Sequence, residues 1–112
     1  MGPDNKLYAI GGFNQTEGCL STIESFDFQK QQWETVTKMT EGKRALSAVA
    51  LPDGLYTLGG YNGKEYLNTV HRYDYFTKKW TQMRSMNSAR GTFAALVSPN
   101  CNYIYAIGGF NG

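Results

Sequence analysis

Two arginines, Arg44 and Arg90, are the residues of this sequence best suited to bind a charged ligand. Each follows a methionine and a short polar stretch. A guanidinium group presents a rigid fork of donors that can hold a carboxylate through two parallel hydrogen bonds. If arginines recur in this way around a ring of repeats, they are predicted to form a positively charged rim that binds an acidic peptide. A structural salt bridge or a loop anchor is the alternative interpretation of the same two residues.

Three aromatic–amide pairs form a second candidate site for a protein partner. Each pair directly follows two glycines, and the pairs are Phe13-Asn14, Tyr61-Asn62 and Phe110-Asn111. Such side chains anchor interfaces with little loss of conformational entropy. Turn formation is the alternative for the asparagines, because Asn-Gly at 62–63 and 111–112 is a strong tight-turn pattern.

Catalytic and metal chemistry find little support in the sequence. His71 is the only histidine, and the corresponding position 47 residues earlier is Glu24, which predicts a variable, solvated position. Asp27 and Asp74 are expected to cap turns through side-chain-to-backbone hydrogen bonds. The sequence contains no clustered metal-ligand spacing, nucleophile elbow or phosphate-binding loop. We therefore predict no catalytic residue, no metal site, no cofactor and no enzyme activity.

These candidate residues belong to a sequence that repeats. The phrase at 7–14 returns at 55–62 and at 104–111, with the first glycines at 11, 59 and 108. Other landmarks recur at a spacing of 47 residues, including an aromatic-Asp-aromatic triplet, a tryptophan and a methionine. A period of this size indicates supersecondary units that bury their faces only by stacking. We assign Arg44 and Arg90, 46 residues apart, to the same repeat position.

Each repeat is predicted to contain four strands. The first predicted strand of a unit is 45–51 or 92–97, and the second is 7–10, 55–58 or 104–107. The third is 22–28 or 69–75, and the fourth is 33–36 or 80–83. These runs have strand length, are rich in apolar, β-branched or aromatic residues, and are bounded by turn residues. No window shows a sustained helical apolar stripe. The sequence therefore predicts an all-β chain of nine strands.

This order of residues resembles the kelch repeat, in which paired glycines follow an apolar strand and precede Tyr-Asp and then Trp. Three Gly-Gly pairs in register with Trp33 and Trp80 extend the resemblance over almost the whole chain. It implies a kelch β-propeller segment of about two and a quarter four-stranded blades, not a closed ring by itself. The expected divisions are a partial blade at 1–43, a complete blade at 44–89 and a partial blade at 90–112. Both tryptophans are expected to pack between neighbouring blades.

The resemblance also implies a function. Kelch propellers recognise proteins through blade-end loops, and the pattern from Arg72-Tyr73-Asp74 to Met86-Asn87-Ser88-Ala89-Arg90 is similar to the BTB-kelch adaptors of cullin ubiquitin ligases. In those adaptors, arginines at the pattern position given to Arg44 and Arg90 line the mouth of the central channel. Two alternatives stay open. One is an actin-associated or scaffold kelch protein, and the other is an enzyme platform whose active-site residues lie in other blades.

Composition narrows the choice of partner and compartment. Eleven basic and nine acidic residues give a net charge of +2, too small to indicate nucleic acid. No apolar run approaches the roughly 18 residues of a membrane span, and no signal peptide is visible. Cys19 and Cys101 show no pairing pattern, which favours a reducing compartment, and we expect a cytoplasmic protein. Unpaired strands at both ends predict self-association of the isolated segment.

Overall fold

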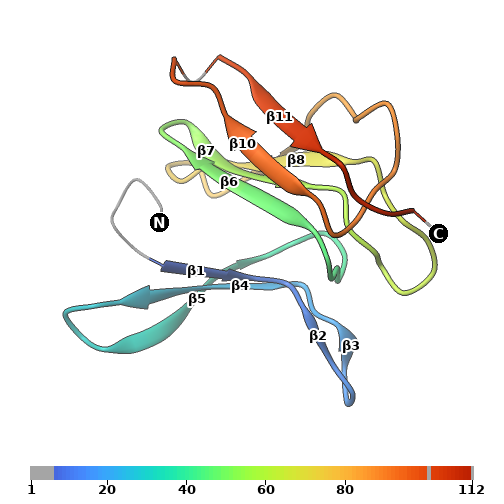
Figure 1. The fold of residues 1–112 in the computed structure, drawn as a ribbon. Helices are drawn as coiled ribbons and strands as arrows, with labels where there is room; N and C mark the ends of the chain where they lie inside the picture. Colours follow the sequence, from blue (N-terminus) through green and yellow to red (C-terminus); the bar gives the residue numbers. More distant parts are fainter. Residues whose placement is uncertain (1–6, 101, 112) are drawn as a thin grey trace.

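The computed structural model describes residues 7–100 and 102–111, which form strands and turns without a helix. Eleven strands build three separate antiparallel sheets and one small hairpin (Figure 1). The sheets lie one above another in the figure, with the second sheet between the other two. The predicted all-β fold, a propeller segment that does not close, is confirmed. The part of the chain described here contains no helix that could span a membrane.

The first sheet has the order β1-β4-β5, with β5 at its outer edge. Its strands are β1 (Leu7–Ile10), β4 (Thr22–Asp27) and β5 (Gln32–Lys38). A hairpin of two short strands, β2 (Phe13–Asn14) and β3 (Gly18–Cys19), extends from this sheet. The sequence did not predict this hairpin, because strands of two residues have no readable periodicity.

The second sheet contains four strands in the order β6-β7-β8-β9. Their bounds are β6 (Ser47–Leu51), β7 (Gly54–Leu58), β8 (Val70–Tyr73) and β9 (Trp80–Gln82). Strand β6 begins two residues later than predicted because Ala45 has a φ of 57°, which lies outside the extended region. Strand β8 ends at Tyr73 because Asp74 begins the turn to β9.

The third sheet pairs β10 (Ala94–Val97) with β11 (Ile104–Ile107). Strand β10 also begins later than predicted, since Thr92 has a φ of 49°. The backbone N–H of Thr92 donates to the carbonyl of Ala45 (2.8 Å), and the Ser47 hydroxyl donates to the carbonyl of Phe93. These bonds join the second and third sheets at their innermost strands. The blade divisions at 43/44 and 89/90 stay a prediction.

The turns after β4 and β8 share one design. One oxygen of Asp27 accepts hydrogen bonds from the backbone N–H groups of residues 29 and 30 (2.9 and 3.2 Å). Asp74 accepts the same bonds from Phe76 and Thr77 (2.8 and 3.1 Å). Hydrogen bonds from Thr77 and Phe76 lower the pKa of the Asp74 carboxyl. The predicted capping role of both aspartates is confirmed.

The core lies between the first and second sheets. It consists of four buried side chains contributed by both sides of the junction, Ile23, Met39, Leu55 and Tyr73. Trp80 packs against this cluster, with its ring centroid 5.2 Å from that of Tyr73. Trp80 therefore lies between two sheets, as predicted.

The described part of the chain does not place Trp33 between two sheets, so for this residue packing between blades stays a prediction. Trp33 is 47% exposed and contacts Phe26 of its own sheet, with ring centroids 5.3 Å apart. Its face of the first sheet points away from the second sheet, and no described residue covers it. Repeat position therefore sets the residue type, whereas burial depends on a neighbouring sheet.

Candidate functional site

The candidate residues gather at the end of the sheets where β7 leads to β8. Arg44 and Tyr61 exchange two backbone hydrogen bonds of 2.9 and 2.8 Å outside the named strands. Gly91 and Phe110 exchange the corresponding pair, at 2.8 and 2.9 Å. Each bridge joins two segments. One is the segment that connects two sheets, and the other begins with the residue after a Gly-Gly pair.

This register corrects the predicted equivalence of Arg44 and Arg90. The residue that forms the bridge of Arg44 in the next repeat is Gly91, 47 residues on. Aligning the two arginines at a spacing of 46 matched residue types but displaced the repeat by one residue. Both arginines still lie in a segment between sheets, but they occupy different positions in it.

Lys43 is the true counterpart of Arg90. The N–H of Lys43 donates to the carbonyl of residue 20, and its carbonyl accepts from residue 12 (2.9 and 2.8 Å). Arg90 makes the same two bonds with residues 67 and 60 (3.0 and 2.9 Å). Since both residues also stand four positions after a methionine, the sequence contained a signal for this match.

Arg44 contacts two aromatic rings. Its guanidinium carbon is 4.9 Å from the ring centroid of Phe13 and 5.1 Å from that of Tyr61. The ring of Tyr66 continues the row, 4.9 Å from Tyr61 and 5.7 Å from Phe110, edge to face with the latter. We call Phe13, Arg44, Tyr61, Tyr66 and Phe110 the aromatic ladder. It connects the first, second and third repeats at one end of the sheets.

The surroundings of Arg44 leave its guanidinium group open to an acceptor. Contact with the two rings restricts the guanidinium group and favours its charge by cation–π attraction. The residue is exposed, and within residues 7–100 and 102–111 its side chain makes no hydrogen bond or ion pair. The in-plane N–H groups are therefore available to an acceptor from another molecule. A carboxylate matches them because it can accept two parallel bonds.

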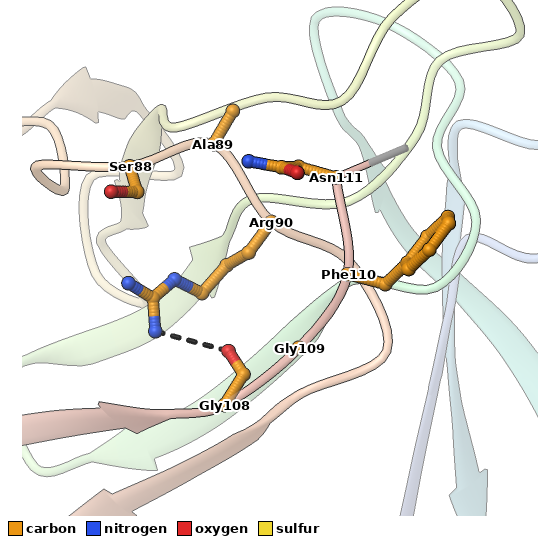
Figure 2. Close-up of a pocket in the computed structure, with 7 residues that line it drawn as sticks. All are labelled: Ser88, Ala89, Arg90, Gly108, Gly109, Phe110 and Asn111. Carbon is orange, nitrogen blue, oxygen red and sulfur yellow. Dashed lines mark hydrogen bonds between the residues drawn. The ribbon is translucent and has the colours of Figure 1, made fainter.

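Arg90 lies in a neighbouring pocket of about 390 Å³ (Figure 2). Its Nη1 donates to the carbonyl oxygens of Gly108 (3.0 Å) and Ala106 (3.4 Å). Ala106 lies in β11 of the third sheet, and Gly108 directly follows that strand. Its Nε is buried and has no hydrogen-bond partner among the described residues. Phe110 and Asn111 line the same pocket. Arg90 therefore anchors one sheet to the next, which is the structural alternative raised for this residue.

The Asn62 side chain is committed to its own loop. Its oxygen accepts hydrogen bonds from the backbone N–H groups of Lys64 and Glu65, both at 2.9 Å. Its amide nitrogen donates to the carboxylate of Glu41, also at 2.9 Å. These contacts match the turn interpretation of Asn62, whereas a direct role in binding is untested.

Lys43 and His71 are two polar residues that are buried or half-buried at the junction of the first and second sheets. Lys43 is only 1% exposed, and burial lowers the pKa of its ammonium group, with Glu41 acting in the opposite sense. His71 is half-buried, and burial followed by the Lys43 charge lowers its pKa. Its ring lies edge-on to Trp80 at 6.4 Å. The predicted solvated position of His71 is therefore wrong, because the neighbouring sheet covers it.

The described residues provide little for metal or redox chemistry. None of their His, Cys, Asp and Glu side chains form a group of three or more that could hold a metal ion. Cys19 is a free thiol that donates to the carbonyl of Tyr61 across the junction, at 3.5 Å. Cys101 lies outside the described residues.

Two residues of this region were missed by sequence reasoning, Lys43 and Tyr66. Tyr66 lies in the loop after Tyr61 and forms an isolated bridge with it. Its aromatic character was visible in the sequence, but nothing there showed that the loop folds back. Only the structure shows that it links Tyr61 to Phe110.

Comparison with known proteins agrees with this architecture. The family model for the KLHDC2/KLHL20/DRC7 Kelch-repeats domain matches residues 1–112. The Caenorhabditis elegans kelch repeat-containing protein kel-10 is 29% identical over 97% of this chain and 19% of that protein. Kelch-like protein 40 of Xenopus laevis is 29% identical over 96% of this chain and 17% of its own length. Kelch-like protein 4 of Homo sapiens is 37% identical over 67% of this chain and 10% of its own length.

The chain spans less than a fifth of the length of these relatives. The match nevertheless covers the three Gly-Gly phrases and all three sheets. A domain of this kind is generally an interaction module rather than a catalyst. The chain therefore belongs to the kelch-repeat family.

Proposed function

We propose that the aromatic ladder binds an acidic segment of a protein partner, with Arg44 as the central contact. The observation that carries this proposal is the contact of the Arg44 guanidinium with both Phe13 and Tyr61, with no described hydrogen-bond or ion-pair partner for its N–H groups. An arginine already held by contacts with two rings loses less side-chain entropy when it binds a carboxylate. The rings beside it supply apolar contact area for the same segment.

The exposed ends of the ladder extend this surface. Phe13 is 52% exposed and Phe110 is 58% exposed, so both offer ring area to a partner. Arg90, Phe110 and Asn111 line the adjacent pocket, which could receive a neighbouring side chain of that segment. Aromatic residues and arginine are the types that most often dominate binding energy at interfaces.

The larger role that we propose is substrate recognition within an adaptor of a cullin-type ubiquitin ligase. The support is the kelch-repeat match and the similarity of the Arg72–Arg90 pattern to such adaptors. The chain itself supplies only the recognition surface in this proposal and performs no catalysis. We place its action in the cytoplasm, in keeping with the unpaired thiol of Cys19.

Binding and stability must be measured together to test the ladder. The complete polypeptide that contains this chain is immobilised as wild type, Arg44→Ala, Arg90→Ala and the control Arg84→Ala, and partners from lysate are quantified by mass spectrometry. Arg84 is an exposed arginine outside the ladder and the pocket. Losing one desolvated Arg–carboxylate contact is expected to remove about 2–4 kcal/mol of binding free energy.

We expect Arg44→Ala to lose partners without a comparable fall in melting temperature, and Arg84→Ala to retain them. Arg90→Ala should lower the melting temperature, because its bonds to Gly108 and Ala106 join two sheets. Retention of every partner by Arg44→Ala would exclude the ladder as the recognition site. The ligase role has its own test, which is whether a cullin is recovered with the complete polypeptide.

Self-association of residues 1–112 alone is a separate part of the proposal. The third sheet exposes Leu96, Tyr105 and Ile107 on one face, each more than half exposed. Exposed apolar faces of this kind drive association. Light scattering of the isolated chain should show oligomers, and a stable monomer at micromolar concentration would contradict this expectation.

A further inference from the structure

A cleft lies between the first and second sheets, at the other end of β8 from the ladder. Its volume is about 290 Å³, and its walls include Tyr8, Val36, Tyr73, Tyr75 and Lys78. The loop with Tyr61 and Tyr66 precedes β8, whereas the turn with Tyr75 and Lys78 follows it. The cleft therefore belongs to a surface separate from the proposed recognition site.

The turn between β8 and β9 presents an apolar and basic tip beside this cleft. Phe76 is 89% exposed, and Lys78 and Lys79 are both exposed. The Asp74 carboxylate holds the backbone of Phe76 and Thr77, so the exposed ring stands on a rigid turn. None of the described carboxylates forms an ion pair with either lysine.

The first repeat contains the same turn with different residues at its tip. Gln29 stands at the position of Phe76, and Gln31 and Gln32 stand at the positions of Lys78 and Lys79. Gln31 and Lys78 adopt the same left-handed conformation, with φ values of 54° and 58°. The fold of this turn therefore requires neither the exposed ring nor the two charges. They are available for another role.

The opposite wall of the cleft is formed by β5, an edge strand. Its seven residues pair with β4 on one side, and no described strand pairs with the other. An edge of this length offers backbone donors and acceptors to an added strand. Glu34 lines the cleft from this wall, and its carboxylate pairs with Lys30 at 3.4 Å, which offsets part of its repulsion of an acidic ligand.

We propose that this cleft binds an extended segment of a partner protein that carries acidic residues and an apolar side chain. The backbone of the segment pairs with the free edge of β5. Its apolar side chain enters the cleft beside Tyr75 and extends toward the exposed Phe76 ring at the tip of the turn, while its acidic residues lie against Lys78 and Lys79. Backbone pairing supplies affinity in this arrangement, and the cleft and the lysines supply specificity.

The test uses a display library of random dodecapeptides, selected on the complete wild-type polypeptide. Selected peptides are then measured by fluorescence anisotropy against a variant with Phe76→Gln, Lys78→Gln and Lys79→Gln, which copies the tip of the first turn. This variant should keep its melting temperature, since the first turn folds with glutamine at these positions. A second variant with only the two lysine changes is prepared in case the ring supports folding. Lys64→Gln removes an exposed lysine elsewhere.

We expect a class of acidic peptides with an apolar residue that binds the triple variant about 10- to 100-fold more weakly than wild type. Arg44→Ala and Lys64→Gln should bind these peptides normally, which separates this site from the ladder. Hydrogen exchange at residues 32–38 should slow when such a peptide is bound. The proposal is overturned if no such class is selected, if its peptides bind the triple variant equally, or if β5 gains no protection.

Discussion

The first two repeats place the same residue types in different surroundings. Trp80 packs on a core that contains Ile23 from the first sheet, whereas Trp33 is nearly half exposed. Likewise, Lys43 is buried between two sheets, whereas its counterpart Arg90 lies in an open pocket. The comparison teaches that the repeat determines residue type and backbone register. The adjacent sheet determines what each residue contributes to stability.

The largest expected effect is the difference in stability loss between alanine substitutions of the two tryptophans. Trp80→Ala should reduce the free energy of unfolding by about 3–5 kcal/mol, because it leaves a cavity beside Tyr73. Trp33→Ala should reduce it by about 1 kcal/mol or less, since the side chain is already half exposed. Urea titration of both variants measures the difference. Equal losses would show that the two repeats are packed alike, and the comparison would fail.

A pair of glycines sharpens the same comparison. Gly59 and Gly108 open the Gly-Gly pairs of consecutive repeats, with φ values of 59° and 74°. A Cβ atom on Gly59 would lie 2.5 Å from the Arg90 carbonyl oxygen, whereas one on Gly108 meets no described atom within 4 Å. Both substitutions carry the strain of positive φ, so only packing distinguishes them.

We expect Gly59→Ala to reduce stability by about 2–3 kcal/mol and Gly108→Ala by about 1 kcal/mol. Thermal unfolding of the two variants in the same polypeptide provides the measurement. If Gly108→Ala proved as harmful as Gly59→Ala, backbone conformation alone would explain both. The close contact between Gly59 and the Arg90 carbonyl would then contribute nothing to the cost of the substitution.

Acidification should weaken the junction between the first and second sheets. Burial, aided by the Lys43 charge, lowers the pKa of His71 in the folded state. The unfolded chain therefore binds more protons between the two pKa values, and stability rises with pH across that interval. Stability is complete above the ordinary imidazole pKa and falls as the pH drops below it.

The measurement is the denaturation midpoint between about pH 7.5 and about pH 5.5, where histidine is the side chain that ordinarily titrates. His71→Gln should flatten the dependence, and Lys43→Met should reduce it by removing the nearby cation. A slope that survives in His71→Gln must arise from other groups, because His71 is the only histidine of the chain.

Much of the fold could be predicted because its determinants are local. The spacing of Gly-Gly pairs, turn aspartates and tryptophans predicted the long strands of all three sheets. Burial could not be predicted for Trp33 or His71, since it depends on the sheet next to each. Aligning the two arginines also displaced the repeat by one residue. The bridge between Gly91 and Phe110 revealed the error, and the spacing from each methionine agrees with the corrected match.

The candidate site was predicted less well than the fold. The sequence identified Phe13, Arg44, Tyr61 and Phe110 as candidates, and the structure brings them into one ladder. It did not identify Tyr66, because the contact depends on a loop that folds back on Tyr61. Sequence patterns therefore select suitable residue types, whereas the order in which side chains touch is a tertiary property.

The smallest expected effect on stability is that of Arg44→Ala. Its contacts with Phe13 and Tyr61 are exposed cation–π pairs, so their loss should reduce stability by only about 0.5–1 kcal/mol. Gly91 occupies the same position in the next repeat and forms the same backbone bridge without any side chain. The fold therefore does not require an arginine here, and thermal unfolding should show a shift of only a few degrees.

This small effect distinguishes the two interpretations of Arg44. Arg84→Ala serves as the control for removing one exposed positive charge from the same chain. A stability loss for Arg44→Ala as large as that for Gly59→Ala would make the residue a structural connection between repeats. A loss of no more than about 1 kcal/mol, together with impaired binding that the control does not show, leaves recognition as its role. The next repeat has glycine at this position, so the fold does not need the Arg44 side chain, and binding would explain why an arginine is present.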